Sequence, residues 1–77
     1  SAPYVTATIL VVLSEDGKVL YKLMARRAGL GLSPLVLSLT EKIAFAPATQ
    51  DGRNVATIAL LKYKFVEGRV EISMPDK

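Results

Sequence analysis

The fold is decided by residues 5–26, which read VTATILVVLSEDGKVLYKLMAR. Every second residue from Val5 to Leu13 is apolar, and the run is rich in β-branched side chains. A period of two with this composition predicts a β-strand. Because Asp16-Gly17 favours the positive φ of a tight hairpin turn, we expect residues 18–26 to return as an antiparallel strand.

Residues 18–26 also alternate, which predicts that two sets of side chains face opposite sides of the sheet. The covered face is expected to receive Val19, Tyr21, Leu23 and Ala25. The open face is expected to receive Lys18, Leu20, Lys22, Met24 and Arg26. In this interpretation Lys18, Lys22 and Arg26 are solubilising groups on the side away from any helix.

A helix is expected over residues 33–43, with Ser33 as the N-cap and Pro34 at the first helical position. Its apolar face is expected to consist of Leu35, Val36, Leu39 and Ile43. Thr40 falls outside that face. Pro47 ends the helix, since the residue before a proline avoids helical geometry. The following aromatic, Phe45, is expected to be buried where helix and sheet meet.

The longest alternating run, residues 55–65, predicts a third strand after a polar loop at residues 50–54. Glu67-Gly68 offers a turn into a short fourth strand at residues 70–72. The predicted fold class is therefore α+β, with one helix packed on one face of a three- to four-stranded antiparallel sheet. The expected strand order is 2-1-3, with a possible fourth strand beside strand 3.

The composition excludes most catalytic and metal chemistry. The chain of 77 residues contains neither cysteine nor histidine, so it has no disulfide, no thiolate metal site and no histidine base. Five of the seven acidic residues fall in predicted turns or the tail, where they cannot converge in a cleft. We therefore expect no enzyme, no catalytic residue, no metal, no cofactor and no small-molecule substrate.

Length and charge limit the possible domain organisation and partners. Residues 1–77 suffice for a single domain, and the Ser-Ala-Pro start suggests a domain excised from a longer envelope protein. The longest run of large apolar residues, 9–13, is far short of the roughly 20 that span a bilayer. The net charge of +3 is too small to indicate nucleic-acid binding by itself.

The order of the turn and helix segments resembles the C-terminal domain of TonB-type energy transducers. In that family a strand ends in an Asp-Gly turn, a helix ends in an aromatic-x-Pro-Ala segment, and an Asn/Asp-Gly turn precedes a strand beginning with Val. The matching segments are Asp16-Gly17-Lys18-Val19, residues 33–43, Phe45-Ala46-Pro47-Ala48 and Asp51-Gly52-Arg53-Asn54-Val55. The resemblance covers about residues 5–65. Pro3-Tyr4 reverses the family's usual Tyr-Pro, so we expect a divergent TonB/TolA-type member.

The resemblance implies a periplasmic interaction module of the cell envelope, serving energy transduction or protein transport. Such a domain is anchored to the inner membrane by an N-terminal helix absent from this chain. Its implied partner is another envelope protein or a peptide segment of one, added by β-augmentation beside the third strand. An exposed strand edge points independently to the same place. The expected partner-binding residues are Ile58, Leu60, Lys62 and Lys64.

Two alternatives stay open. The first is a structural domain that forms a homodimer by exchanging strands at the same edge. The second is a basic-sheet nucleic-acid-binding domain. Sheets that bind RNA stack bases on exposed aromatic rings, whereas parity places Tyr21, Tyr63 and Phe65 on covered faces. A nucleic acid is therefore not the expected partner.

Overall fold

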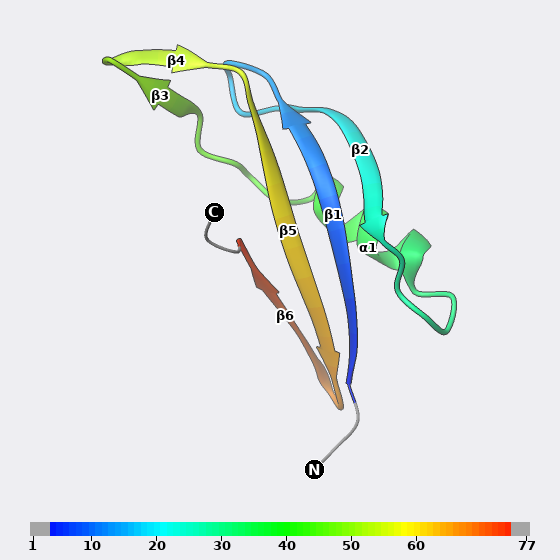
Figure 1. The fold of residues 1–77 in the computed structure, drawn as a ribbon. Helices are drawn as coiled ribbons and strands as arrows, with labels where there is room; N and C mark the ends of the chain where they lie inside the picture. Colours follow the sequence, from blue (N-terminus) through cyan, green and yellow to red (C-terminus); the bar gives the residue numbers. More distant parts are fainter. Residues whose placement is uncertain (1–3, 75–77) are drawn as a thin grey trace.

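The computed structural model describes residues 4–74, which form one helix and six strands (Figure 1). The elements are β1 (Val5–Leu13), β2 (Val19–Arg26), α1 (Ser33–Glu41), β3 (Ala48–Gln50), β4 (Arg53–Val55), β5 (Thr57–Val66) and β6 (Arg69–Ser73). Four strands form an antiparallel sheet in the order β2-β1-β5-β6, and α1 packs against β1 and β2 on one face. The predicted α+β class is confirmed.

A second, two-stranded sheet was not predicted. β3 and β4 pair where the sequence indicated a polar loop, and Ala56 separates β4 from β5. Asp51 and Gly52 have φ values of 52° and 78°, which are the two positive values of a tight hairpin turn. The hairpin projects beyond the end of the larger sheet (Figure 1). Asp51-Gly52 is the same turn signal as Asp16-Gly17, which predicted the first hairpin. The sequence therefore contained the signal for this second hairpin too.

The turn between β1 and β2 is fixed by Ser14. The Ser14 carbonyl accepts the Gly17 N–H at 2.9 Å, and the Ser14 N–H donates to the Lys18 carbonyl at 2.8 Å. The Ser14 hydroxyl accepts the N–H groups of Asp16 and Lys18. Gly17 is buried with a φ of 82°, and a Cβ there would overlap the Phe45 carbonyl oxygen. The turn therefore docks on the segment that follows the helix.

A β-bulge in β2 overturns the predicted alternation. Leu13 pairs with Val19, but Val12 pairs with Tyr21, so Leu20 is an extra residue in the ladder. One inserted residue moves every following side chain to the other face of the strand. The predicted faces are consequently exchanged beyond Leu20. A second irregularity follows near the end of β2, before Arg26 pairs with Thr8.

Four predicted placements, those of Tyr21, Lys22, Leu23 and Met24, are wrong for this reason. Leu23 lies on the open face opposite Leu10, whereas Met24 lies opposite the buried Ile9 and packs against the core. Lys22 lies opposite the buried Val11, on the helix side, where it forms an ion pair with Glu41. Tyr21 lies on the open face and is 56% exposed. Lys18 and Arg26 are exposed, as expected.

The core lies between α1 and the face of the sheet that it covers. Its buried apolar residues are Ala7, Ile9, Val11, Leu13, Ala28, Val36, Leu61 and Tyr63. The helix differs from the prediction. Ser33 is its first residue and Leu32 its N-cap, without a side-chain hydrogen bond, and Leu35 is exposed. Phe45 packs against the core but is only partly buried, whereas the sequence predicted that it would be buried.

Thr40, placed outside the apolar helix face by the sequence pattern, is fully buried. Its hydroxyl lies 2.7 Å from the Val36 carbonyl oxygen and 2.6 Å from the Tyr63 hydroxyl. A carbonyl oxygen only accepts, so Thr40 donates to Val36 and the Tyr63 hydroxyl donates to Thr40. These two hydrogen bonds link α1 to β5. Among the described residues no buried side-chain nitrogen or oxygen lacks a partner.

We predict that Gly17→Ala destabilises the domain more than Gly68→Ala. Both glycines have a φ near 80°, which costs an alanine about 1–2 kcal/mol. Only at Gly17 does the new methyl group meet backbone, which adds about 1–3 kcal/mol of overpacking. Urea unfolding of both variants measures the difference. Equal losses of unfolding free energy would show that the turn does not dock on Phe45.

A double-mutant cycle tests the bond between helix and sheet. Thr40→Val leaves the buried Tyr63 hydroxyl without a partner and should cost about 1–3 kcal/mol. Tyr63→Phe should cost about 1 kcal/mol, since Thr40 keeps its bond to Val36. The double variant should cost clearly less than the sum, because the two residues share one interaction. Additive losses in denaturant melts would contradict the hydrogen bond.

Candidate functional site

The candidate site is the part of the β5 edge that β6 leaves uncovered. β5 has ten residues and β6 has five. Their register pairs Lys62 with Ser73 and continues to Val66 with Arg69. On this side, residues 57–61 have no strand partner among the described residues. Unpaired N–H and C=O groups of such an edge can accept a further strand.

An apolar pocket of about 590 Å³ lies beside this open stretch. It is lined by Leu10, Leu13, Phe45, Ala46, Ala48, Thr57, Ile58, Ala59, Leu60 and Met74. Leu13 and Phe45 belong to the helix side of the sheet, whereas Leu10 lies on the open side. The pocket therefore wraps around the edge. Its lining contains no charged side chain, so it suits apolar groups.

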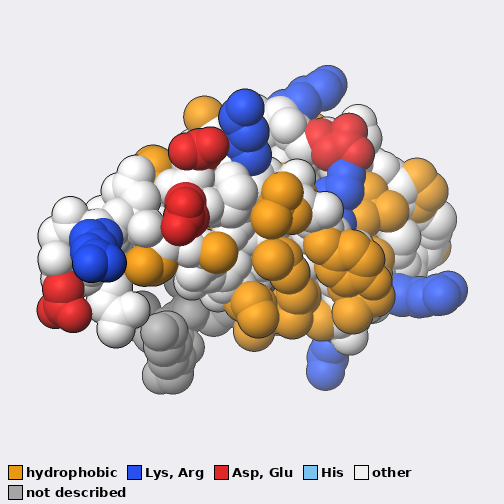
Figure 2. Space-filling view, turned by 90° about the horizontal axis from the view of Figure 1, so that it is seen from above, with side chains coloured by type: hydrophobic (Ala, Val, Ile, Leu, Met, Phe, Trp, Pro, Cys, Tyr) orange, Lys and Arg blue, Asp and Glu red, His pale blue; other side chains and the backbone are white. Residues whose placement is uncertain are grey.

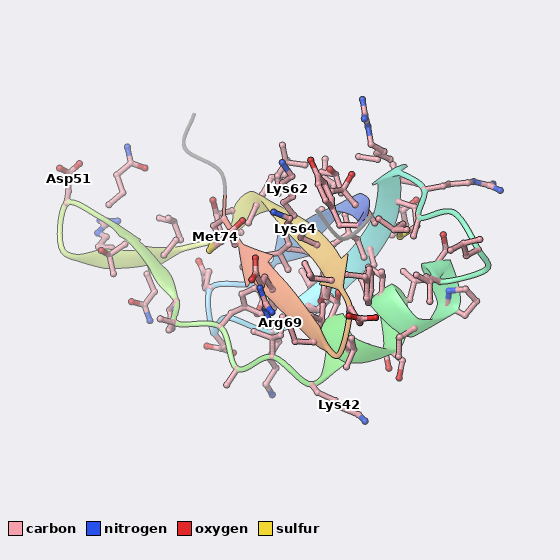
Figure 3. All side chains as sticks on the ribbon, turned by 90° about the horizontal axis from the view of Figure 1, so that it is seen from below. Lys42, Asp51, Lys62, Lys64, Arg69 and Met74 are labelled. Carbon is pink, nitrogen blue, oxygen red and sulfur yellow. The ribbon has the colours of Figure 1, made fainter. Side chains whose placement is uncertain are left out.

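The four residues predicted to bind a partner divide into two pairs. Ile58 and Leu60 line the pocket and are 64% and 43% exposed. Lys62 and Lys64 belong to the half of β5 that β6 covers. The Lys64 amine lies 4.4 Å from the centre of the Tyr4 ring, a cation–π contact. Figure 3 shows Lys62 and Lys64 on the side of the sheet opposite Lys42, which extends from the end of α1.

The two outer edges of the four-stranded sheet are poorer templates for a new strand. β2 carries two register irregularities, and bulges disrupt the regular spacing that strand addition needs. β6 is short, and its Arg69 and Glu71 form an exposed ion pair at 2.9 Å. Charged residues on a short edge strand discourage pairing. Residues 57–61 of β5 contain neither a register irregularity nor a charged side chain.

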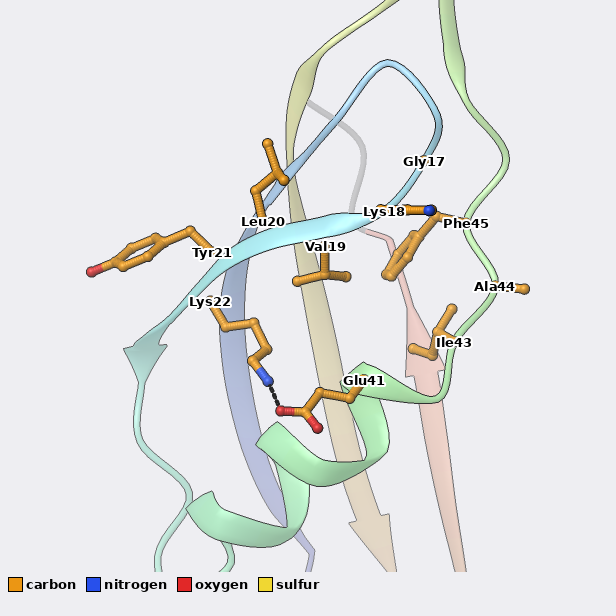
Figure 4. A pocket seen from close by; sticks show the side chains of 10 residues that line it. All are labelled: Gly17, Lys18, Val19, Leu20, Tyr21, Lys22, Glu41, Ile43, Ala44 and Phe45. Carbon is orange, nitrogen blue, oxygen red and sulfur yellow. Dashed lines mark hydrogen bonds and ion pairs between the residues drawn. The ribbon is translucent and has the colours of Figure 1, made fainter.

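A hollow of about 690 Å³ separates the β2 edge from the residues that follow α1. Figure 4 shows Lys22 and Glu41 pointing toward each other across it. Their ion pair ties β2 to the end of the helix and leaves no free charge between them. Residues 4–74 contain no group of three or more side chains that could hold a metal ion.

The sequence pattern missed the character of the open face of the sheet. The bulge in β2 turns Tyr21 and Leu23 to this face, beside Leu10 and Val12 of β1. Ile58 and Leu60 of β5 complete a set of six apolar residues, here called the apolar block. Figure 2 shows hydrophobic side chains gathered in an exposed cluster, with both basic and acidic side chains at its margin. The bulge has no sequence signal strong enough to predict this face.

No family model, curated protein or solved structure matches the chain. In the described part, no helix has the length and apolarity needed to cross a membrane. The function of the chain is therefore inferred from the open edge, the pocket and the exposed faces.

Proposed function

We propose that the domain is a protein–protein interaction module that binds an extended segment of another protein as an added strand. The observation that carries the proposal is the uncovered edge at residues 57–61, directly beside an apolar pocket. The proposed host is a TonB/TolA-like transducer of the cell envelope, with this domain in the periplasm. The resemblance of the turn and helix motifs supports that setting.

The ligand strand would lie antiparallel to β5, in line with β6. Main-chain hydrogen bonds would supply affinity, and alternate side chains would supply selectivity. One set of side chains would enter the pocket near Leu13 and Phe45. The other set would lie beside Ile58 and Leu60 on the open face. An acidic residue at the end of the ligand nearest Lys62 would complement the exposed ammonium group.

β6 limits the length of ligand that the edge accepts. A segment confined to residues 57–61 leaves β6 in place, whereas a longer one must displace β6 from residues 62–66. Apparent affinity for the longer segment falls with the fraction of time that the edge is covered. β6 therefore acts as a competitor built into the chain.

A charge placed in the pocket should weaken binding. Ala46 is exposed and lines the pocket. Ala44, on the same segment, is also exposed but lines the hollow beside β2. Peptides selected from a random display library on the wild-type domain serve as probes. We expect Ala46→Lys to weaken their binding by about tenfold or more. Ala44→Lys should leave the dissociation constant nearly unchanged.

Amide exchange locates the bound peptide. The proposal requires new protection in residues 57–61 when the peptide is present. New protection confined to α1 or β2, or an equal loss of affinity in both lysine variants, would contradict it.

Truncation after Gly68 tests the role of β6. A peptide long enough to pair with residues 57–66 should bind more tightly to the truncated chain, because its competitor is gone. A peptide that spans only residues 57–61 should gain little. Val70→Gly, which weakens β6 without shortening the chain, should act in the same direction. Unchanged affinity of the long peptide for both folded variants would show that β6 does not compete.

Sedimentation of the truncated chain tests the main alternative, a homodimer formed by strand exchange. Strand exchange between copies at the β5 edge would appear as a dimer that the long peptide dissociates. Salt-dependent binding of a single-stranded oligonucleotide, lost with Lys62→Gln and Lys64→Gln, would favour the nucleic-acid alternative instead.

A further inference from the structure

The register of β5 decides which side chains of an added strand would reach the pocket. Residues directly opposite each other in an antiparallel pair place their side chains on the same face of the sheet. Ala59 pairs with the buried Val11 of β1, so Ala59 belongs to the face that α1 covers. Ligand residues opposite Thr57 and Ala59 would therefore face the helix side. Those opposite Ile58 and Leu60 would face the open side, beside the apolar block.

The pocket lies where the covered side of β5 changes from large to small residues. Leu61, Tyr63 and Phe65 carry large side chains on this side, and the first two are buried. Thr57 and Ala59 continue the same side with small side chains, and both line the pocket. The volume of about 590 Å³ is therefore found where the side chains of the strand itself are too small to fill the space.

β6 shows which side chains β5 accepts from a strand on this edge. Val70 and Ile72 of β6 lie on the covered side, opposite two aromatic residues of β5. Glu71, between them, lies opposite Lys64 on the other side. Met74, two residues after Ile72, lines the pocket. A ligand strand in line with β6 would continue this row of apolar side chains, which occupies every second residue.

We propose that the ligand strand carries one large apolar side chain, here called the anchor, opposite Ala59, and that Ala59 determines this preference. The proposal rests on the strand addition proposed above. Along β5 the pocket is bounded by Ala48, which pairs with Val55 before Thr57, and by Met74, which follows the last paired residue of β6. The position opposite Ala59 lies between these two boundaries, so the pocket accepts a single anchor there.

The lining of the pocket favours an aromatic anchor such as phenylalanine. Phe45 is only partly buried and supplies an aromatic surface, and rings pack well against other rings. Met74 supplies a flexible thioether, which also packs favourably against rings. A charged anchor would lose hydration without gaining a partner, since no charged side chain lines the pocket. A small anchor would leave the space unfilled, whereas large side chains in pockets supply most of the energy of an interface.

An exchange of side-chain size between domain and peptide tests the anchor. The probes are the peptides selected on the wild-type domain, with their register on β5 read from nuclear Overhauser contacts. Replacing the residue opposite Ala59 by alanine should weaken binding by about tenfold or more. Ala59→Leu should weaken the parent peptide to a similar extent, because the new side chain occupies the pocket. The alanine-substituted peptide should bind Ala59→Leu at least as tightly as it binds the wild-type domain.

Two further variants control the test. Ala25→Leu adds the same side chain to β2, at an exposed position that β1 separates from β5, and should leave both affinities unchanged. Ala46→Leu narrows the pocket from the segment after α1, where the residue is exposed, and should weaken the parent peptide. This variant leaves the sheet unaltered, so it carries the test even if Ala59→Leu does not fold.

The outcomes separate the anchor from strand addition. Suppose that the alanine-substituted peptide binds the wild-type domain as tightly as its parent, with new amide protection still in residues 57–61. That result would overturn the anchor and leave strand addition intact. Parent affinity unchanged in Ala46→Leu would also overturn the anchor. If no selected peptide produces new protection in residues 57–61, both proposals fail together.

Discussion

The unbroken register between β1 and β5 is the constraint on which the rest of the structure depends. It pairs every residue from Val5 to Leu13 with a residue of β5, without a bulge. It places Tyr63 opposite Ala7 on the covered face, where the Tyr63 hydroxyl reaches Thr40 of the helix. A slip of one residue would expose this buried set to solvent and bury the other face. The register therefore determines the core and the open face together.

The lengths of the strands on either side of β5 determine how much of its edge stays open. β1 covers one side of β5 through nine of its residues, whereas β6 covers only five on the other. The remaining main-chain groups lie beside an apolar pocket rather than a charged or bulged edge. An edge of this kind either recruits a strand or must be blocked. The strand addition that we propose at residues 57–61 rests on this geometry and on the resemblance of the turn and helix motifs.

The sequence predicted the elements whose signals are local and missed those that depend on pairing. Period-two runs and Asp16-Gly17 predicted the first hairpin, and the helix was placed close to its observed bounds. The extra residue at Leu20 is a property of the pairing between β1 and β2, so parity gave the wrong face for Lys22 and Tyr21. Thr40 was assigned to the polar side of the helix because its hydroxyl partner lies far along the chain. For the site, Ile58 and Leu60 are exposed at the pocket and remain predicted binding residues. The end of β6, which decides how much of the β5 edge is open, is visible only in the structure.

Hydrogen exchange of the free, dilute domain tests the open edge most directly. Along a strand, successive N–H groups point alternately to the two neighbouring strands. In residues 57–61, the amides directed away from β1 should therefore exchange almost as fast as those of an unstructured peptide. In residues 62–66, amides of both sets should be protected, because β6 pairs with this half. Equal protection along the whole of β5 would show that the edge is already covered, and would contradict strand addition at this site.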